Sequence, residues 1–292
     1  MKKIIEKAGV LIEALPYIQR FRGTIVVVKF GGSAMEEKAQ YDSILSDVTF
    51  MECVGMLPVI VHGGGKAISR RMSEAGLRAK FVKGLRVTDD ETIRIVESVI
   101  REEINPGIVE TLRQKGARAQ GLNGDSVFRV IRRTEVDDKT GETLDWGYVG
   151  DIREVVVDPI LACLRAETIP VITPLGRGPD GKVYNINADD AAAAVARALT
   201  ARKVAFLSDV PGLLRDPADP TSVMSTLKVH EVEDLIAKGV IDGGMLPKIR
   251  SGVDALQHGV QKVHIIDGRL PHSLLLEVFT DEGVGTEIVQ DD

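Results

Sequence analysis

Short apolar runs alternate along the chain with longer segments in which apolar residues recur every three or four positions. Strands are expected at the apolar runs, which cover residues 24–28, 57–61, 169–173, 204–207 and 263–266. The segments between them have the spacing of helices that present one apolar face to a sheet. Strands that alternate with helices in this way predict an α/β fold, a three-layer αβα sandwich around one mostly parallel open sheet.

A further amphipathic helix is expected over residues 2–20, before the first strand. Its apolar positions are spaced four, three, four and three apart, at Ile4, Ala8, Leu11, Leu15 and Ile18. This spacing forms a seam suited to a second helix, so the segment fits either an oligomer contact or packing against its own domain. Pro16 lies inside the pattern and is expected to kink or interrupt the helix.

Polar and glycine-rich stretches mark other boundaries. Residues 117–157 alternate polar and apolar positions and predict an antiparallel hairpin region, and residues 178–181 predict a second hairpin tip. Thr88, with Glu91 three residues later, is expected to cap the next helix. Asn187 is expected to cap an alanine-rich helix.

Composition narrows the classes of function. The 292 residues carry a net charge of −6 without a basic block, which argues against nucleic acid as a partner. No apolar stretch has the length that spans a bilayer, and the first residues are too charged for a signal peptide. A cytoplasmic location without a membrane partner is therefore expected. Cys53 and Cys163 stand far apart in apolar contexts and are expected to be buried, reduced thiols.

Glycines follow two of the expected strands. Lys29, Gly31 and Gly32 end the first strand, and residues 63–65 are three glycines that end the second. A strand, a glycine turn and a helix start leave main-chain amides free for an anion, and ligands bind at the carboxyl ends of parallel strands. Lys66 is not followed by Ser or Thr and the upstream glycine is missing, which excludes a P-loop.

Polar residues also stand where three helices begin. Arg86 precedes a helix and could grip a carboxylate through two parallel hydrogen bonds, or it could be a surface arginine. Asn185, Asn187 and Asp189 cluster at the start of the alanine-rich helix, where capping requires one of them. Lys248 lies in the first turn of a later helix, where the helix dipole disfavours a cation, which suggests a bound anion.

These residues favour one type of chemistry. No constellation of His, Ser or Cys suggests a nucleophile, and no metal-ligand spacing occurs. Cations and amides without a general base suit phosphoryl transfer to an acceptor that is already ionised, such as a carboxylate with a pKa of about 4. Positive charge would offset the repulsion between the two anions.

The chain resembles the amino-acid kinase family in six motifs, which occur in the order VVVKFGGSAM, VIVHGGGKAIS, GLRVTD, YNINADDAA, LSDVPGLL and GGMLPKI. Within the family it is similar to arginine-sensitive members that use ATP with Mg²⁺ to phosphorylate the side-chain carboxylate of N-acetyl-L-glutamate. The resemblance implies an oligomerisation helix over residues 1–22, an acceptor-binding lobe over residues 23–174, and a nucleotide-binding lobe with a regulatory tail over residues 175–292.

The resemblance also implies roles for single residues. Lys29 and Lys248 would flank the transferred phosphoryl group, and Asp189 would hold the two lysines in place. Acceptor contacts are implied for Gly64, Gly65, Arg86 and Asn185, and nucleotide contacts for Gly31, Gly32, Asp209 and Gly212. Mg²⁺ would arrive with ATP, so no protein ligand for a metal is expected. Ser33 departs from the family motif, which usually has Asn or a small residue there.

Regulation is implied by both ends of the chain. The N-terminal helix resembles the extension with which arginine-inhibited members join dimers into a hexameric ring, so a homodimer or hexamer is expected. The tail resembles their arginine-sensing end, where His264, Glu277 and Gly283 would contact the inhibitor L-arginine. The alternative for each is structural: a strand histidine, a helix-surface glutamate and a turn glycine.

Two other functions stay open. The chain could phosphorylate a different carboxylate, as aminoadipate-derivative and aspartate kinases of the family do, or it could be an amino-acid sensor that has lost the reaction. Lys29, Asp189 and Lys248 occur together, which argues against the sensor. An assay of N-acetylglutamate against glutamate, aspartate and aminoadipate would separate these candidates.

Overall fold

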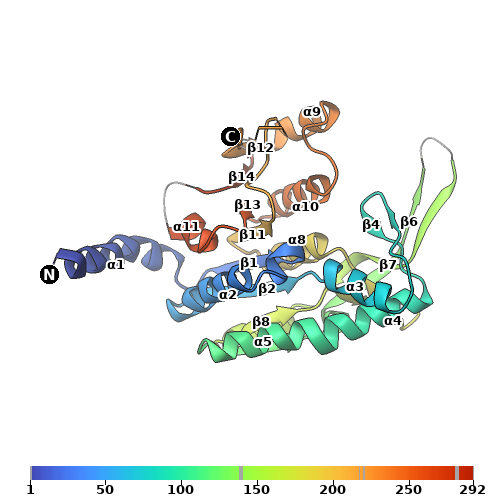
Figure 1. The fold of residues 1–292 in the computed structure, drawn as a ribbon, viewed down its shortest axis with the longest axis horizontal. Coiled ribbons are helices and arrows are strands. Elements are labelled where there is room, and N and C mark those ends of the chain that lie inside the picture. Colours follow the sequence, from blue (N-terminus) through green and yellow to red (C-terminus); the bar gives the residue numbers. More distant parts are fainter. Residues whose placement is uncertain (1, 138–140, 217, 220, 280–282, 292) are drawn as a thin grey trace.

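The computed structural model of the chain describes residues 2–137, 141–216, 218–219, 221–279 and 283–291, without the side chains of residues 2–8, 11 and 33. Within these residues, one open sheet of eight strands forms the centre of the molecule (Figure 1). Its strands follow in the order β12 (Thr226–Lys228), β14 (Thr286–Val289), β13 (Lys262–Asp267), β11 (Lys203–Ser208), β1 (Ile25–Phe30), β2 (Leu57–His62), β8 (Ile169–Ile172) and β5 (Ala119–Leu122). Neighbouring strands are parallel except β13 and β14, which confirms the predicted sheet.

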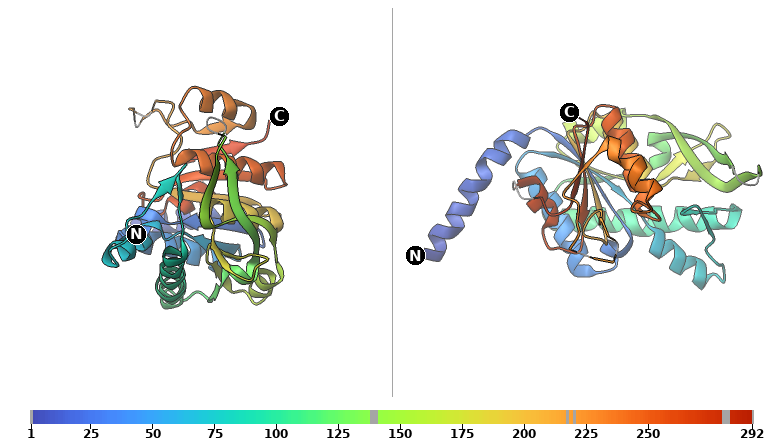
Figure 2. Two further views of the ribbon diagram at one scale, coloured as in Figure 1. Left: turned by 90° about the vertical axis from the view of Figure 1, so that its right-hand side faces the viewer. Right: turned by 90° about the horizontal axis from the view of Figure 1, so that it is seen from above.

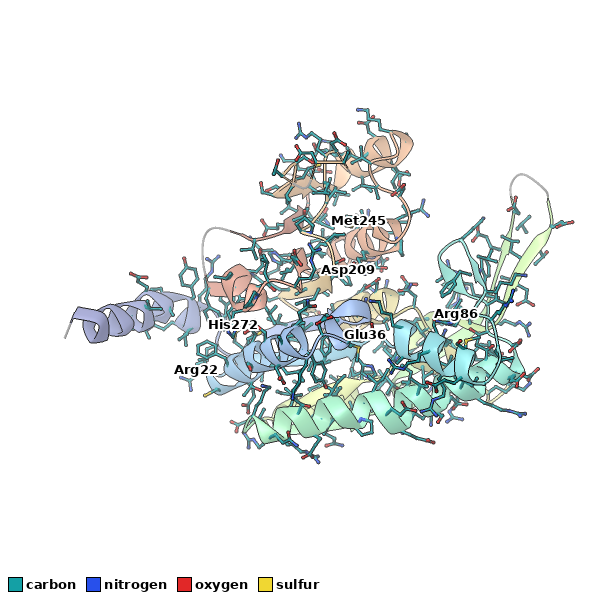
Figure 3. The ribbon with its side chains drawn as sticks, viewed as in Figure 1. Arg22, Glu36, Arg86, Asp209, Met245 and His272 are labelled. Carbon is teal, nitrogen blue, oxygen red and sulfur yellow. The ribbon has the colours of Figure 1, made fainter. Side chains whose placement is uncertain are left out.

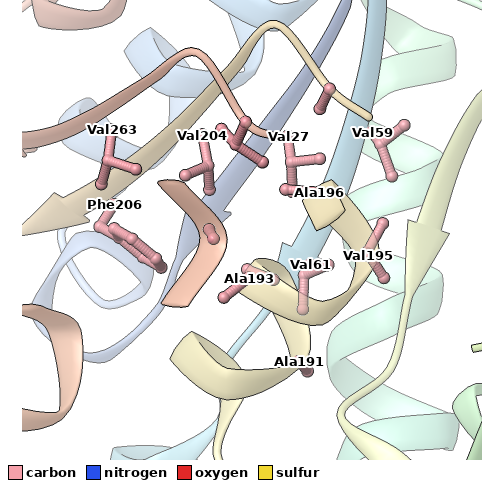
Figure 4. Close-up of a cluster of buried hydrophobic side chains, with 14 of the residues drawn as sticks. Val27, Val59, Val61, Ala191, Ala193, Val195, Ala196, Val204, Phe206 and Val263 are labelled. Carbon is pink, nitrogen blue, oxygen red and sulfur yellow. The ribbon is translucent and has the colours of Figure 1, made fainter. Parts of the chain in front are cut away.

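Helices cover both faces of this sheet. Side chains alternate along a strand, so Val27 of β1 faces one helical layer, whereas Val26 and Val28 face the other. The first layer consists of α7 (Asp158–Arg165), α8 (Ala188–Ala198), α9 (Val232–Ala237) and α10 (Met245–Gln257). The second consists of α2 (Lys38–Cys53), α5 (Asn105–Gln114) and α11 (Ser273–Phe279). Figure 4 shows valines of the sheet against alanines of α8, whose small side chains let the helix lie close to the strands. The predicted three-layer sandwich is confirmed.

Four further strands form a small closed barrel beside the main sheet (Figure 1). Its strands are β6 (Phe128–Val136), β7 (Thr143–Val155), β9 (Leu175–Arg177) and β10 (Val183–Asn185). The antiparallel pairs β6–β7 and β9–β10 confirm the two predicted hairpins, although the first predicted region also contains β5 of the main sheet and the short helix α6 (Gly124–Val127). Residues 138–140, between β6 and β7, lie outside the described residues.

One long helical segment runs without a break through α4 (Asp90–Ser98), the π-helical turn η2 (Val99–Ile104) and α5. The prediction that Thr88 caps this segment is wrong by one residue. Asp89 is the N-cap, and its carboxylate accepts from the Thr92 N–H at 2.8 Å. Thr88 is held in an extended conformation instead, because its N–H donates to Trp146 O at 2.8 Å and its carbonyl accepts from Tyr148 N–H at 2.6 Å.

Helix α1 (Lys2–Phe21) extends away from the body of the molecule (Figure 2). The sequence predicts a kink or an interruption at Pro16; the helix continues through this residue, so it is not interrupted there. Val10, Ile12 and Leu15 are exposed on it, whereas Phe21 at its end is buried. The seam positions Ile4, Ala8 and Leu11 lie outside the described side chains.

The remaining short elements are η1 (Gly32–Met35), α3 (Gly65–Glu74), the hairpin of β3 (Phe81–Val82) and β4 (Leu85–Arg86), and η3 (Val229–Glu231). Among the helices that the structure describes, none combines the length and apolar character needed to cross a bilayer. Cys163 is buried, as predicted. The prediction for Cys53 is wrong: this residue is exposed, because it ends α2 where the chain turns toward β2.

Candidate active site

The two glycine turns lie side by side at the carboxyl ends of the neighbouring strands β1 and β2. The carbonyl of Phe30 accepts from the Gly63 N–H at 2.8 Å. A Cβ atom on Gly31 would lie 3.0 Å from Gly63 Cα, so the two turns pack backbone against backbone without room for a side chain. Gly32 has a φ of +60°, a left-handed conformation that favours glycine, and it begins η1.

Lys29, Asp189 and Lys248 meet next to these turns, although they belong to β1, α8 and α10. Lys29 Nζ lies 2.7 Å from Asp189 Oδ1, and Lys248 Nζ lies 2.8 Å from Asp189 Oδ2. The side chain of Asn187 accepts from the Asp189 N–H at 2.8 Å, which confirms the predicted cap of α8 and places Asp189 in the first helical turn. The fold therefore brings two lysines that are far apart in the sequence onto one carboxylate.

Burial and charge determine the protonation of this cluster. Burial lowers the pKa of Lys29, because an ammonium group loses water there, and the nearby Lys248 lowers it further while Asp189 opposes the shift. Burial alone would raise the pKa of Asp189, but the two lysines outweigh it and hold this pKa below its usual range. The carboxylate therefore stays ionised at neutral pH, where it is a weak proton acceptor and a suitable counter-ion for the lysines.

A cavity of about 640 Å³ adjoins the cluster. The predicted acceptor residues all line it, namely Gly64, Gly65, Arg86 and Asn185, together with Gly31 and Gly32. Its charged lining consists of Lys29, Lys66, Arg86, Glu36 and Asp189, of which Figure 3 labels Glu36 and Arg86. This excess of positive charge, together with the N-terminus of α3, suits an anionic ligand.

Arg86 is held firmly at the wall of the cavity. Its Nη2 donates to Gly65 O at 2.9 Å and to Ser69 Oγ at 2.8 Å, and its Cζ lies 4.8 Å from the centroid of the Phe81 ring. The residue is 7% exposed, so the alternative of a surface arginine is wrong. Within the described part of the chain, Arg86 has no carboxylate partner, which leaves a buried cation beside the cavity.

Asp209 and Gly212 lie outside the lining of this cavity. They follow β11, whose register with β1 pairs Phe206 with Lys29, so Asp209 stands at the same edge of the sheet as the first glycine turn. Asp209 is exposed, and Figure 3 labels its position. Gly212 is buried with a φ of +148°, and a Cβ atom there would lie 2.7 Å from Thr286 Oγ1, so packing by itself requires glycine.

The three residues predicted to contact arginine also meet in the fold. His264 Nδ1 on β13 lies 2.7 Å from Glu277 Oε1 on α11, and both side chains are buried, so the alternative of a surface glutamate is wrong. Glu277 Oε2 accepts from the Val284 N–H at 2.9 Å, and a Cβ atom on Gly283 would lie 3.3 Å from both carboxylate oxygens. Burial tends to raise the pKa of Glu277, but the contact with His264 outweighs it and lowers this pKa. Burial also lowers the pKa of the nearby Lys203 to about 8.

Sequence reasoning missed several residues of the cavity. Ser69 and Phe81 hold Arg86 in place, and Glu36 adds a negative charge to the lining. Ser69 could have been found, since it lies four residues after Gly65 on one helix face. Phe81 carries no comparable signal. Among the described residues, no cluster of His, Cys, Asp and Glu could hold a metal ion.

The sequence is similar to those of known proteins over nearly its whole length. The sequence model of the amino acid kinase family matches residues 24–267. An acetylglutamate kinase from Akkermansia muciniphila is 46% identical over 290 residues, which cover 99% of this chain and 97% of the relative.

A protein of known crystal structure also has this fold. N-acetylglutamate synthase from Neisseria gonorrhoeae, complexed with coenzyme A and N-acetyl-glutamate, has a TM-score of 0.84 at 27% identity, over 98% of this chain and 64% of the synthase. The same synthase complexed with coenzyme A and L-arginine has a TM-score of 0.80 at 27% identity, over 96% and 64% of the two chains. This chain thus spans less than two thirds of the synthase. The family match, the full-length similarity and the fold together establish that the chain belongs to the amino acid kinase family.

Proposed function

We propose that the protein is an acetylglutamate kinase. It transfers the γ-phosphoryl group of ATP to the side-chain carboxylate of N-acetyl-L-glutamate and yields N-acetylglutamyl 5-phosphate, the second step of arginine biosynthesis. The observation that carries the proposal is the buried contact of Lys29 and Lys248 with Asp189, beside a cavity whose lining suits an anion. The 46% identity to the acetylglutamate kinase of A. muciniphila supports this choice of acceptor.

The reaction requires positive charge rather than a base. An acceptor carboxylate has a pKa of about 4 and is ionised at neutral pH, so one of its oxygens can attack the γ-phosphorus directly. The bond from that phosphorus to the bridging oxygen breaks, and ADP leaves with the electron pair. Lys29 and Lys248 offset the repulsion between the anions and stabilise the charge that develops during transfer. Asp189 holds both ammonium groups at the reacting centre.

The acceptor binds in the cavity described above. Backbone amides of Gly64 and Gly65, at the start of α3, donate to one carboxylate of N-acetyl-L-glutamate. Arg86 clamps its α-carboxylate, since the guanidinium is buried, held by Ser69 and free of any carboxylate partner in the described residues. Asn185, which lines the same cavity, adds a hydrogen bond.

The nucleotide approaches from the other side of the cluster. Gly31 and Gly32 face the phosphates of ATP. The two glycine turns fit a phosphate group, because Gly31 packs closely on Gly63 and leaves main chain rather than side chains at this edge of the sheet. Asp209 and Gly212 contact the nucleotide after β11. Mg²⁺ would arrive with ATP, held mostly by phosphates and water, and would help to neutralise their charge. In this arrangement residues 23–174 form the acceptor-binding lobe and residues 175–292 the nucleotide-binding lobe.

Arginine inhibition and assembly complete the proposal. His264, Glu277 and Gly283 bind L-arginine, a role supported by their mutual contacts and by the crystallised complex of the gonococcal synthase with L-arginine. Residues 1–22 join dimers into a hexamer, which is supported by the exposed apolar side chains of the projecting α1. The protein works in the cytoplasm.

An acceptor panel tests this function. The full-length protein is incubated with ATP, Mg²⁺ and either N-acetylglutamate, glutamate, aspartate or an aminoadipate derivative, and ADP formation is measured. Hydroxylamine traps the acyl phosphate as a hydroxamate, which distinguishes transfer to a carboxylate from ATP hydrolysis. We expect the highest kcat/KM with N-acetylglutamate. A preference for another acceptor would assign the protein to a different carboxylate kinase, and the lack of turnover with every acceptor would indicate a sensor without activity.

A further inference from the structure

A buried pair of polar side chains lies directly beneath the second glycine turn. His62, the last residue of β2, is fully buried, and Asn105, the first residue of α5, is 7% exposed. The Asn105 Nδ2 atom lies 3.0 Å from His62 Nε2 and 2.9 Å from the carbonyl oxygen of Val171. On its other side, His62 Nδ1 lies 3.0 Å from the carbonyl oxygen of Gly63. Neither side chain has a role in the proposed chemistry.

These contacts determine which imidazole nitrogen carries the proton. The Val171 carbonyl can only accept, so the Asn105 atom that faces it is the amide nitrogen, and its second N–H donates to His62 Nε2. Nε2 is therefore the acceptor of a neutral ring, and the ring proton is on Nδ1, which donates to Gly63 O. Burial agrees with a neutral ring, since it lowers the pKa of His62 to about 4.

The bond to Gly63 sets the direction of the next amide. In a planar trans peptide the C=O and the following N–H point in opposite directions. Because the Gly63 carbonyl turns toward His62, the Gly64 N–H turns away from it. Gly63, Gly64 and Gly65 line the acceptor cavity. Glycine has a wide choice of backbone conformations, so three glycines in a row need an external contact to hold one orientation.

The π-helical turn η2 carries Asn105 to this position. Its residues Ile100 and Ile104 pack so tightly under the glycine turn that a Cβ atom on Gly64 would lie 2.6 Å and 2.9 Å from their Cδ1 atoms. A Cβ atom on Gly121 of β5 would overlap the side-chain oxygen of Asn105. Strand β5 is thus shaped around the Asn105 amide, and the glycine turn around the two isoleucines of η2. Single π-helical turns inside α-helices are frequent at functional sites.

We propose that His62 and Asn105 are positioning residues, which form a hydrogen-bond relay from Val171 O to Gly63 O and aim the Gly64 amide at the acceptor carboxylate. This inference rests on the proposed function of the cavity. The relay acts chiefly on acceptor binding, because its last bond ends one residue before the Gly64 amide that lines the acceptor cavity. Gly63 also packs against Gly31 of the proposed nucleotide site, so a smaller effect on ATP binding is expected.

Two substitutions of His62 separate its two contacts. The amide nitrogen of asparagine can occupy the place of Nδ1 and donate to Gly63 O, whereas glutamine reaches the place of Nε2 and loses the bond to Gly63. We expect His62→Gln to raise the KM of the acceptor about tenfold or more, the value of one hydrogen bond of about 1.4 kcal/mol. His62→Asn keeps the bond to Gly63 and loses only the contact with Asn105, so its acceptor KM should rise by no more than about threefold, and in both variants the KM of ATP should change less than that of the acceptor. Equal acceptor KM values for the two variants, or an equal rise in the KM of ATP, would overturn the relay.

A spectroscopic test needs no substrate. Long-range ¹H–¹⁵N correlation of the full-length ¹⁵N-labelled protein reports the protonation of each imidazole nitrogen, and the His62 signals are assigned from their loss in the labelled His62→Asn variant. We expect a neutral ring with its proton on Nδ1 at pH 7. A proton on Nε2, or a charged ring, would refute the relay whether or not N-acetylglutamate is the acceptor. Lack of turnover with N-acetylglutamate in the wild type would instead overturn the proposed function.

Discussion

Replacement of Asp189 by asparagine tests the contact on which the candidate site is built. The substitution keeps the shape of the side chain and removes its charge, so Lys29 and Lys248 lose their shared counter-ion. All three side chains are largely buried, with exposed fractions of 8% for Asp189, 10% for Lys29 and 15% for Lys248. We predict a large loss in the free energy of unfolding and a strong loss of turnover.

The magnitude follows from the distances. Two unit charges 4 Å apart attract by about 4 kcal/mol at an effective dielectric constant of about 20, and both contacts here are shorter. Removal of one partner from a buried ion pair costs about 3–5 kcal/mol, because an uncompensated charge stays in the interior. We therefore expect Asp189→Asn to lower the free energy of unfolding by about 3–5 kcal/mol at pH 7.

The loss of stability caused by Asp189→Asn should become smaller as the pH rises. Burial already lowers the pKa of Lys29, and the substitution removes the carboxylate that opposes this shift. In the variant, folded Lys29 releases its proton at a pH where unfolded Lys29 still holds it, so stability rises with pH up to the ordinary lysine pKa. Burial lowers the pKa of Lys29 in the wild type too, but less, because Asp189 opposes the shift. The difference from wild type should therefore shrink as pH rises toward the ordinary lysine pKa.

Urea unfolding at several pH values measures both effects. Asp190→Asn is the matched control, since Asp190 is the next residue of α8, accepts from Ser251 Oγ at 2.6 Å and contacts neither lysine. Asp190 Oδ2 also lies 3.8 Å from Arg133 Nη1, but the Asp190 side chain is 40% exposed, and an exposed ion pair contributes little, so the substitution should cost less than about 1 kcal/mol. Equal losses in the two variants, or a loss for Asp189→Asn that does not change with pH, would refute this account of the cluster.

Four further predictions concern the acceptor, the lysines, the first helix and the buried histidine. Lys248→Ala should lower kcat by about 10²-fold or more with little change in the acceptor KM, and near-normal turnover in a steady-state assay would contradict its role. Arg86→Ala should raise the acceptor KM by about 10- to 100-fold, the value of a charged hydrogen bond, and an unchanged KM would exclude the clamp. Deletion of residues 1–20 should leave dimers in analytical ultracentrifugation and weaken inhibition by arginine, whereas hexamers after deletion would exclude this role for α1. Burial lowers the pKa of His62 to about 4, so between pH 6.5 and pH 4 only the unfolded protein takes up a proton on this ring. The free energy of unfolding should therefore decrease as pH falls through this range. Wild type should lose about 1.4 kcal/mol per pH unit relative to His62→Asn in urea unfolding, and parallel pH profiles would contradict the buried neutral ring.

Much of the fold can be predicted from the local sequence. The apolar runs at residues 24–28 and 57–61 form inner strands, because residues that are apolar at every position can be buried on both faces of a covered sheet. Asn187 caps α8 as expected, since a single side-chain oxygen that accepts from nearby N–H groups is a local feature. Such features depend only on residues a few positions away along the chain, so the local sequence is enough to predict them.

Other local expectations failed where distant segments intervene. Thr88 has the pattern of a helix cap, yet its backbone pairs with β7, and Asp89 takes the cap instead. Arg86 stands in a loop by sequence, but Ser69 of α3 and the Phe81 ring enclose it. Cys53 lies in an apolar context and is exposed nonetheless, because it ends its helix. In each case the outcome depended on contacts across the fold or on the end of an element.

The sequence by itself determined the class of fold, the order of the motifs and the identity of the charged residues that need partners. Only the tertiary structure decided that Lys29 and Lys248 meet on Asp189, and that His62 and Asn105 lie beneath the glycine turn. The physical reason is that a strand or helix forms from local spacing, whereas the distance between two side chains depends on strand order and on which helix covers which face. β1 lies between β11 and β2, and α8 and α10 pack over the same face, so residues from three separate elements converge at one end of the sheet.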